Sequence, residues 1–400
     1  MTKTIRTLSL IAVGLLGANA FAAEGYFGAQ LADHESNGAE IVALLPDSPA
    51  ANAGFREGDH ITGAGGTEID NAETLAAQLR SFGANRTIEV RYIRGGVEQQ
   101  AQLTLGRNPW QNANQPDDDP DLHTVQIRID IAYAGTADEK QRLDLYLPQS
   151  DVAVPGMLWI HGGGWSTGDR ANERALALRF AERGIAVAAI SYRLSAGDWA
   201  DPSLPSEGVQ HPAHAQDAAA AFSWLHDNAE ALGINPNALY VSGHSSGGHL
   251  AALLATDKRY LSHHGLRTSA LAGALPVGGA YDIADYHAAL TQGDDPAMGE
   301  AHIRAVFGTT EQEWLDASPT QFVGETRIPM LVVVEEQDAF ERYADRLRSA
   351  AATAGRSNVE FYQAQGRRHG NVVLLMSGRH ADSVRARMLR FMEANASPVS

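Results

Sequence analysis

Between residues 123 and 400, short hydrophobic runs alternate with longer segments whose hydrophobic residues recur at helical spacing. Runs such as Leu331–Val334 are hydrophobic at consecutive positions, which is typical of strands covered on both faces. We expect strands at Val125–Tyr133, Arg142–Leu147, Met157–His161, Ala186–Tyr192, Ala238–Ser242, Gly273–Val277, Met330–Val334 and Val359–Gln363. We expect helices at Asn172–Arg183, Pro212–Ala229, Ser246–Thr256, Phe340–Ala354 and His380–Ala394. This alternation predicts an α/β fold with a doubly wound, mostly parallel sheet, whose first two strands form an antiparallel hairpin at one edge.

Residues 23–107 follow a different pattern and are predicted to form a smaller α+β domain. Strand-like runs occur at Ile41–Leu45, Thr87–Ile93 and Gln99–Leu105. One helix is expected at Ala72–Phe82, with Leu75 and Leu79 on the same face. Residues 108–122 are rich in Pro, Asn and Asp, cannot bury hydrophobic surface, and are predicted to be a solvated linker. The larger domain then occupies residues 123–400.

Three segments of the smaller domain, Gly25–Ala29, Asp47–Phe55 and Arg56–Ile61, resemble a PDZ domain of the permuted bacterial kind. The resemblance implies a groove that binds a peptide or a protein C-terminus by strand addition. It implies that the peptide contacts Tyr26, Phe27, Gly28 and Ala29 in the carboxylate-binding loop, and Leu75 and Leu79 across the groove. The alternative is a domain that only packs on, or tethers, the rest of the chain.

The charge and the first residues limit where the protein works. A formal net charge of -17 argues against a nucleic-acid partner and against docking on an anionic membrane, because both need a basic face. Lys3 and Arg6 precede the hydrophobic run Leu8–Leu16, and small residues follow up to Ala22. Residues 1–22 are therefore predicted to be a secretory signal peptide, with an uncleaved anchor as the alternative. Since the run is shorter than a spanning helix, we expect a periplasmic or secreted protein without stable membrane insertion after cleavage.

The sequence Gly243-His244-Ser245-Ser246-Gly247 follows an expected strand and opens an expected helix, as a nucleophile elbow requires. Such a turn strains the backbone of Ser245, and Gly243 and Gly247 remove side chains that would clash with it. The helix that begins at Ser246 directs its first amides at a developing oxyanion. We predict that Ser245 is a nucleophile and that the Ser246 amide helps to form an oxyanion hole.

A second glycine-rich segment, His161-Gly162-Gly163-Gly164-Trp165, also follows an expected strand. Consecutive glycines expose backbone amides with no side chain in the way, so Gly163, Gly164 and Trp165 are candidate oxyanion donors. A phosphate-binding loop is the alternative, but the Lys-Ser/Thr pair that such a loop needs is missing.

Together with Gly168-Asp169 and Ile190–Leu194, these two motifs resemble the α/β-hydrolase esterases that carry the H-G-G-G signature. This hormone-sensitive-lipase-like group includes carboxylesterases, feruloyl and acetyl esterases, and arylformamidases such as kynurenine formamidase. The resemblance covers nearly all of residues 123–394. It implies the α/β-hydrolase fold and a triad in the chain order Ser, Asp, His.

The resemblance also implies where the acid and the base lie. Asp338 matches the last position of the usual Gly-x-x-Asp pattern after a late strand, although Glu335 stands where the glycine is usual. Glu335 and Glu336 are therefore rivals for the acid. His369 lies in a loop after the next expected strand and is the predicted base, with His380 as its competitor.

These residues favour a hydrolase that cleaves small-molecule esters and uses no cofactor. No metal is expected, because the chain has no cysteine and no His-Glu-x-x-His spacing. The alternatives are an amide hydrolase of the arylformamidase or peptidase type and a catalytically silent PDZ scaffold. We expect His244 and His249 to be packing or surface residues, Trp165 and Tyr281 to line the pocket or to pack, and Ser195–Gln210 to form part of a lid.

Overall fold

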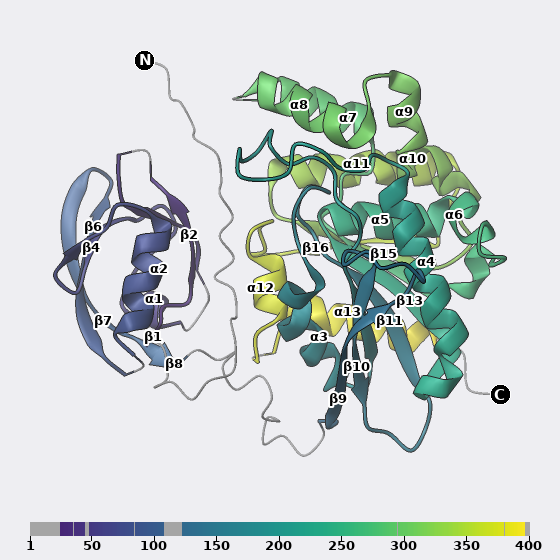
Figure 1. The fold of residues 1–400 in the computed structure, drawn as a ribbon, viewed down its shortest axis with the longest axis horizontal. Coiled ribbons are helices and arrows are strands. Elements are labelled where there is room, and N and C mark those ends of the chain that lie inside the picture. The colour runs from purple at the N-terminus through teal and green to yellow at the C-terminus, as the bar shows by residue number, and fades with distance from the viewer. Residues whose placement is uncertain are drawn as a thin grey trace. The chain divides into compact units, whose positions relative to one another are not determined.

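The structure is a computed structural model that describes residues 25–396 except 35, 45–47, 84, 108–121, 294 and 380. The predicted signal peptide, nearly all of the predicted linker, and His380 lie outside the described residues. The described chain forms two compact units (Figure 1), of which one carries β1–β8 and the other carries β9–β16.

The first unit has a sheet of order β2-β3-β4-β6-β7, with β5 paired to β4. Its strands are β1 (Gly25–Tyr26), β2 (Ala29–Asp33), β3 (Ala39–Leu44), β4 (His60–Ala64), β5 (Thr67–Glu68), β6 (Thr87–Arg94), β7 (Val97–Thr104) and β8 (Gly106–Arg107). Its helices are α1 (Pro49–Asn52) and α2 (Ala72–Ser81). Alternate residues of β6 are buried, as expected for a strand with one face on a core, so Ile88 and Val90 pack inward. Leu75 and Leu79 of α2 lie in the same core.

The second unit is built on an eight-stranded sheet of order β16-β15-β14-β13-β11-β12-β10-β9. Its strands are β9 (Val125–Ala132), β10 (Arg142–Pro148), β11 (Val154–Ile160), β12 (Ala186–Ile190), β13 (Ile234–His244), β14 (Gly273–Val277), β15 (Met330–Glu335) and β16 (Val359–Ala364). β10 pairs antiparallel with β9 and β12, and the other pairings are parallel. The predicted edge hairpin and the mostly parallel sheet are therefore confirmed.

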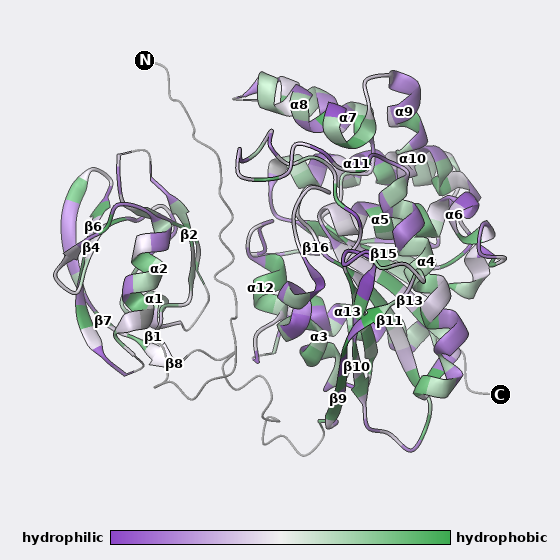
Figure 2. Ribbon diagram, in the orientation of Figure 1, coloured by the Kyte–Doolittle hydropathy of each residue, from purple (hydrophilic) through white to green (hydrophobic). Residues whose placement is uncertain are grey.

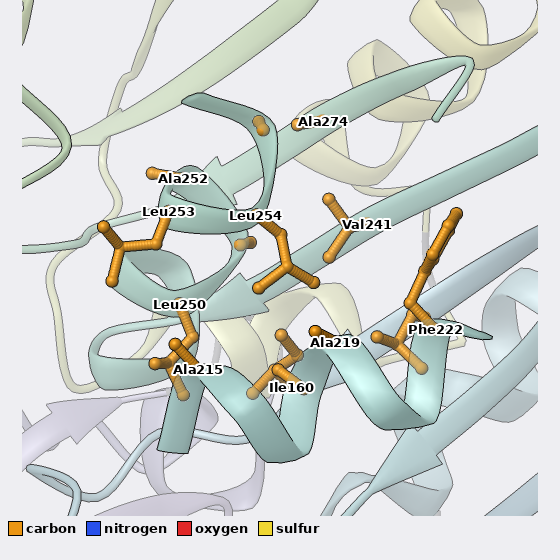
Figure 3. Close-up of a cluster of buried hydrophobic side chains, with 14 of the residues drawn as sticks. Ile160, Ala215, Ala219, Phe222, Val241, Leu250, Ala252, Leu253, Leu254 and Ala274 are labelled. Carbon is orange, nitrogen blue, oxygen red and sulfur yellow. The ribbon is translucent and has the colours of Figure 1, made fainter. Parts of the chain in front are cut away.

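Helices cover both faces of this sheet. They include α3 (Arg174–Ala181), α4 (Ala213–Asn228), α5 (Ser246–Thr256), α11 (Asp338–Thr353) and α13 (Ser383–Asn395). Ile160 and Val241 of neighbouring strands pack with α4 and α5 in one hydrophobic cluster (Figure 3). The phenol of Tyr240, which points to the opposite face of the sheet, donates a hydrogen bond to the Met392 carbonyl of α13. Figure 2 shows that the helices carry both hydrophobic and hydrophilic residues, as expected for helices with one face against a sheet.

A helical insertion between β14 and β15 was not expected from the sequence. Its helices are α7 (Ile283–Thr291), α8 (Pro296–Phe307), α9 (Glu311–Asp316) and α10 (Pro319–Phe322). The side chains of Asp282, Asp295 and Thr310 accept hydrogen bonds from the first amides of α7, α8 and α9 and so start these helices. The shorter helices are α6 (Lys258–Ser262) and α12 (Val372–Met376), with single turns at Arg170–Glu173, Glu230–Leu232, Thr268–Ala270 and Val323–Glu325. No helix among the described residues has the length and hydrophobicity to cross a lipid bilayer.

Candidate active site

Ser245 occupies a sharp turn between β13 and α5, as the sequence predicts. Its φ of 57° and ψ of -119° are unusual for a residue with a side chain, and they lift the hydroxyl out of the turn. The Ser245 amide donates a 2.9 Å hydrogen bond to the Val277 carbonyl of β14, which anchors the turn. A Cβ atom at Gly247 would lie 2.0 Å from the Ile160 carbonyl oxygen, so only glycine fits there. A Cβ atom at Gly243 would lie 2.6 Å from the same oxygen.

A continuous hydrogen-bonded chain connects Ser245 to a histidine and a carboxylate. Nε2 of His369 lies 2.9 Å from Oγ of Ser245, and Nδ1 of His369 lies 2.6 Å from Oε2 of Glu335. His369 stands in the loop after β16, and Glu335 is the last residue of β15. The arrangement is that of a serine nucleophile, a general base and an acid that orients the base.

The carboxylate that contacts His369 is that of Glu335 and not that of the predicted Asp338. Glu335 ends the strand and its side chain is fully buried against His369, whereas Asp338 is the first residue of α11. The side chain of Asp338 lies outside the described residues. Glu336 has another role, since its Oε2 accepts a 2.7 Å hydrogen bond from the Gly366 amide and so holds the loop that carries the base. Glu335 thus stands three positions before Asp338, at the end of the strand itself.

Space for this glutamate comes from a neighbouring glycine. A Cβ atom at Gly278 would lie 2.3 Å from Oε1 of Glu335, and the φ of 54° at Gly278 also favours glycine. The carboxylate therefore fills the volume beside the end of β14.

The surroundings keep Glu335 ionised and His369 neutral. Burial alone would raise the pKa of Glu335, but the charge of His369 and hydrogen bonds from His244 and His369 lower that pKa to about 2. Burial lowers the pKa of His369 below the usual histidine range, although the charge of Glu335 opposes this shift. A neutral imidazole next to a serine hydroxyl can accept its proton near neutral pH.

Two residues around the triad were missed by sequence reasoning. Nε2 of His244 lies 3.1 Å from Oε1 of Glu335, so His244 is neither a surface residue nor simple packing. The ring of Phe340 stacks on the imidazole of His369 with centroids 3.6 Å apart and an interplanar angle of 12°. The position of His244 directly before Ser245 was a usable signal, because β13, β14 and β15 are parallel and their carboxyl ends lie at the same edge of the sheet. Nothing in the sequence pattern distinguished Phe340.

The glycine-rich loop after β11 lies against the nucleophile. A Cβ atom at Gly162 would lie 3.2 Å from Cβ of Ser245. Gly163, Gly164 and Trp165 have φ values of 121°, 58° and 60°, a succession of left-handed conformations that turns the chain sharply over the elbow. The structure thus places Gly162, the first glycine of this loop, next to Ser245.

Other residues of the motif segments pack against the glycine-rich loop and the turn at Ser245. His161 is buried, stacks on Tyr192 with centroids 4.4 Å apart, and has its pKa lowered to about 4 by burial. The phenol of Tyr192 lies 3.1 Å from Oγ of Ser246, which connects β12 to the first turn of α5. A Cβ atom at Gly168 would lie 2.4 Å from Nδ1 of His161.

Aromatic residues of the insertion pack beside the oxyanion loop. Trp165 is 2% exposed, and its ring meets Phe307 of α8 edge-on with centroids 4.8 Å apart. Tyr281 is 1% exposed, and its phenol oxygen accepts a hydrogen bond from the Gly279 amide, so both of these residues are packing residues. Trp199 of the expected lid segment stacks on His302 of α8 with centroids 3.9 Å apart.

The predicted absence of a metal rested on spacing in the sequence. Among the described residues, His244, Glu335 and His369 form a group whose nitrogen and oxygen atoms all lie within 4.8 Å of one another and could hold a metal ion. In the structure these atoms face each other and Ser245 as hydrogen-bond partners.

Comparison with known proteins defines the class to which this fold and site belong. The structure of esterase B from Lactobacillus rhamnosis superposes with a TM-score of 0.56 at 22% identity, covering 72% of this chain and 90% of that one. This likeness shows the α/β-hydrolase fold. The BD-FAE family model matches residues 143–345, just over half of the chain, and a PDZ domain model matches residues 25–105. The chain belongs to the BD-FAE family and carries a PDZ domain that precedes its α/β-hydrolase domain in the sequence.

Curated relatives match over shorter segments. A probable isoprenylcysteine alpha-carbonyl methylesterase from Arabidopsis thaliana is 34% identical over 128 residues, which are 32% of this chain and 27% of the relative. An ethyl acetate hydrolase from Pseudomonas putida is 32% identical over 202 residues, which are 46% of this chain and 54% of that enzyme. The matched segment thus spans between about a quarter and about half of these two relatives.

Proposed function

We propose that this protein is a serine carboxylesterase that cleaves carboxylic esters through an acyl-serine intermediate. The observation that carries the proposal is the unbroken contact from Ser245 through His369 to the buried carboxylate of Glu335. The names of the two relatives, a methylesterase and an ethyl acetate hydrolase, support esters of small alcohols as substrates.

The proposed reaction has two halves. His369 takes the proton of Ser245 as the hydroxyl oxygen attacks the ester carbonyl, and Glu335 stabilises the imidazolium that forms. Amides of the glycine-rich loop and of Ser246 stabilise the oxyanion, each worth about 3–4 kcal/mol in the transition state. His369 returns the proton to the leaving alkoxide, and the alcohol departs. Water, activated by His369, then attacks the acyl-serine and releases the carboxylic acid.

The test is ester hydrolysis by the purified full chain beside two serine variants. p-Nitrophenyl esters from acetate to decanoate measure ester cleavage, and an N-formyl arylamine measures the alternative amide cleavage. Ser245→Ala should lose about 10⁴- to 10⁶-fold in kcat. Ser262→Ala, a matched control that removes an exposed hydroxyl at the end of α6, should behave as wild type. Ester turnover that survives Ser245→Ala would rule out this mechanism, and a folded but inactive wild type would favour the scaffold.

We also propose that the PDZ domain recruits a peptide beside β2. Among the described strands β2 pairs only with β3, which supports strand addition along its other edge. Gly28, with a φ of 82°, forms the turn between β1 and β2, where the carboxylate-binding loop is expected. Peptides with a free C-terminus should bind the full chain more tightly than the same peptides amidated at that end. Equal binding of both forms would contradict a carboxylate-binding loop.

Export is proposed from the signal-like residues 1–22. Expression of the full chain in a Gram-negative host should yield periplasmic protein whose measured mass corresponds to cleavage after Ala22. Full-length protein retained in the cytoplasm would contradict this proposal.

A further inference from the structure

Glu335 is held by two histidines rather than one. Its Oε2 faces Nδ1 of His369 at 2.6 Å, and its Oε1 faces Nε2 of His244 at 3.1 Å. The two imidazole rings lie side by side, with centroids 4.5 Å apart and an interplanar angle of 35°. The mechanism proposed above uses only the contact to His369.

A carboxylate in this position needs a donor for each oxygen. The side chain of Glu335 has 0% exposure, so solvent cannot replace a missing partner. A buried charged oxygen without a hydrogen bond is costly, and the group relieves that cost by rotating or by taking up a proton. His244 supplies the donor to Oε1 when its Nε2 carries the proton.

Because of where His244 lies in the chain, its contact with Glu335 links two strands of the sheet. His244 is the last residue of β13 and immediately precedes Ser245, so its hydrogen bond links the strand that carries the nucleophile to the acid at the end of β15. A Cβ atom at Gly162 would lie 3.1 Å from the His244 carbonyl oxygen and 3.3 Å from its Nδ1. The glycine-rich loop therefore packs against the same histidine and limits the movement of its ring.

We propose that His244 is a positioning residue that fixes the Glu335 carboxylate, so that its other oxygen holds His369 in line with Ser245. This inference rests on the proposed function, because it assigns a role within the same triad. Its action runs through Glu335 and does not require contact with the substrate.

The titratable groups that face Glu335 are His244 and His369. Burial raises the pKa of the Tyr281 phenol, and the charge of Glu335 helps to raise that pKa further. Hydrogen bonds to the ionised carboxylate help to lower the pKa of Glu335 to about 2. Removal of the His244 donor leaves the carboxylate less stabilised, so the coupled pair of Glu335 and His369 should take up its proton at a higher pH.

Two amide variants with different reach test this role. The side-chain nitrogen of His244→Gln lies about where Nε2 lies in histidine, whereas the shorter side chain of His244→Asn cannot reach Oε1. With p-nitrophenyl acetate, we expect His244→Asn to lose about 10- to 100-fold in kcat with little change in KM. His244→Gln should recover most of that loss. The acid limb of the profile of kcat/KM against pH should move to higher pH in His244→Asn alone.

A spectroscopic measurement covers the case in which the variants lose stability. The proton between Nδ1 of His369 and Glu335 should give a low-field ¹H NMR signal in wild type and in His244→Gln. The same signal should be broadened or lost in folded His244→Asn. Equal kcat, pH profile and low-field signal in all three proteins would overturn the role of His244. Equal impairment of the Gln and Asn variants would also overturn it, because it would indicate packing rather than donation.

Failure of this inference differs from failure of the proposed function. If Ser245→Ala abolishes turnover while both His244 variants resemble wild type, only the positioning role is wrong. If turnover survives Ser245→Ala, the triad itself is wrong.

Discussion

Replacement of Glu335 by glutamine separates the acid seen in the structure from the acid that the sequence pattern favours. Glu335→Gln keeps the shape of the side chain and removes its charge, next to an imidazole that becomes positive in the transition state. Two unit charges about 4 Å apart interact by about 4 kcal/mol at an effective dielectric constant of about 20. Since each 1.36 kcal/mol is tenfold in rate, kcat should fall by about 10³-fold. The analogous Asp-to-Asn change in a serine protease triad costs about 10⁴-fold, in part because it favours the wrong tautomer.

The pH profile gives a second, independent readout of the same variant. The charge of Glu335 raises the pKa of His369, so its loss should move the acid limb of kcat/KM to lower pH. A variant that had merely unfolded locally would expose His369 to water, and the acid limb of kcat/KM would then move to higher pH.

Asp338→Asn is the matched control for this experiment. It removes one negative charge three residues further along the chain, at the start of α11. We expect its kcat to stay close to that of wild type, because Glu335 and not Asp338 contacts His369. The assay is p-nitrophenyl acetate hydrolysis between about pH 5 and 9, with thermal unfolding followed by circular dichroism. Full activity in Glu335→Gln together with a loss of about 10³-fold in Asp338→Asn would refute the assignment of the acid.

Three further predictions concern the elbow, the base and the core. Gly247→Ala should abolish esterase activity and lower the unfolding temperature, because its Cβ atom would collide with a backbone carbonyl of β11; normal kinetics would contradict the elbow geometry. Burial lowers the pKa of His369, and Phe340→Ala uncovers one face of its ring, so the acid limb of the profile of kcat/KM against pH should move to higher pH. An unchanged acid limb would show that the stacking does not affect the pKa of His369. Burial lowers the pKa of one core histidine to about 4 and of two others to about 3, so the unfolded chain binds more protons than the folded one below about pH 6.5. Calorimetry should therefore show an unfolding temperature that falls steadily from about pH 6.5 to 4, and a flat profile would contradict these shifts. These histidines are His211, His214 and His249.

Much of the hydrolase domain could be predicted because its signals are local. Consecutive hydrophobic residues define the buried strands, and the glycines at 243 and 247 are required by contacts with the end of a neighbouring strand. The fold class is confirmed, including the antiparallel strands at one edge of the sheet. Ser245, His369 and the start of the glycine-rich loop at Gly162 lie close together, as their order in the sequence suggested.

The remaining features depend on how side chains reach across the sheet. The sequence pattern favours Asp338 over Glu335 and Glu336, and it does not reveal that Glu335, at the end of β15, directs its carboxylate at His369. The pair formed by His244 and Glu335 joins residues 91 positions apart in the chain. Three of the four helices in the insertion α7–α10 have nine residues or fewer, and Gly, Asp and Pro separate them, so little hydrophobic periodicity develops there.

The most direct test of Ser245 as the nucleophile is to identify the serine that an active-site reagent modifies covalently. Wild-type protein is treated with a p-nitrophenyl alkylphosphonate, which leaves a stable phosphonyl group on an activated serine, and is then digested and sequenced by mass spectrometry. We expect stoichiometric labelling of Ser245, a loss of esterase activity in proportion to labelling, and no labelling in Ser245→Ala. Labelling of Ser246, or inactivation with Ser245 unmodified, would contradict it.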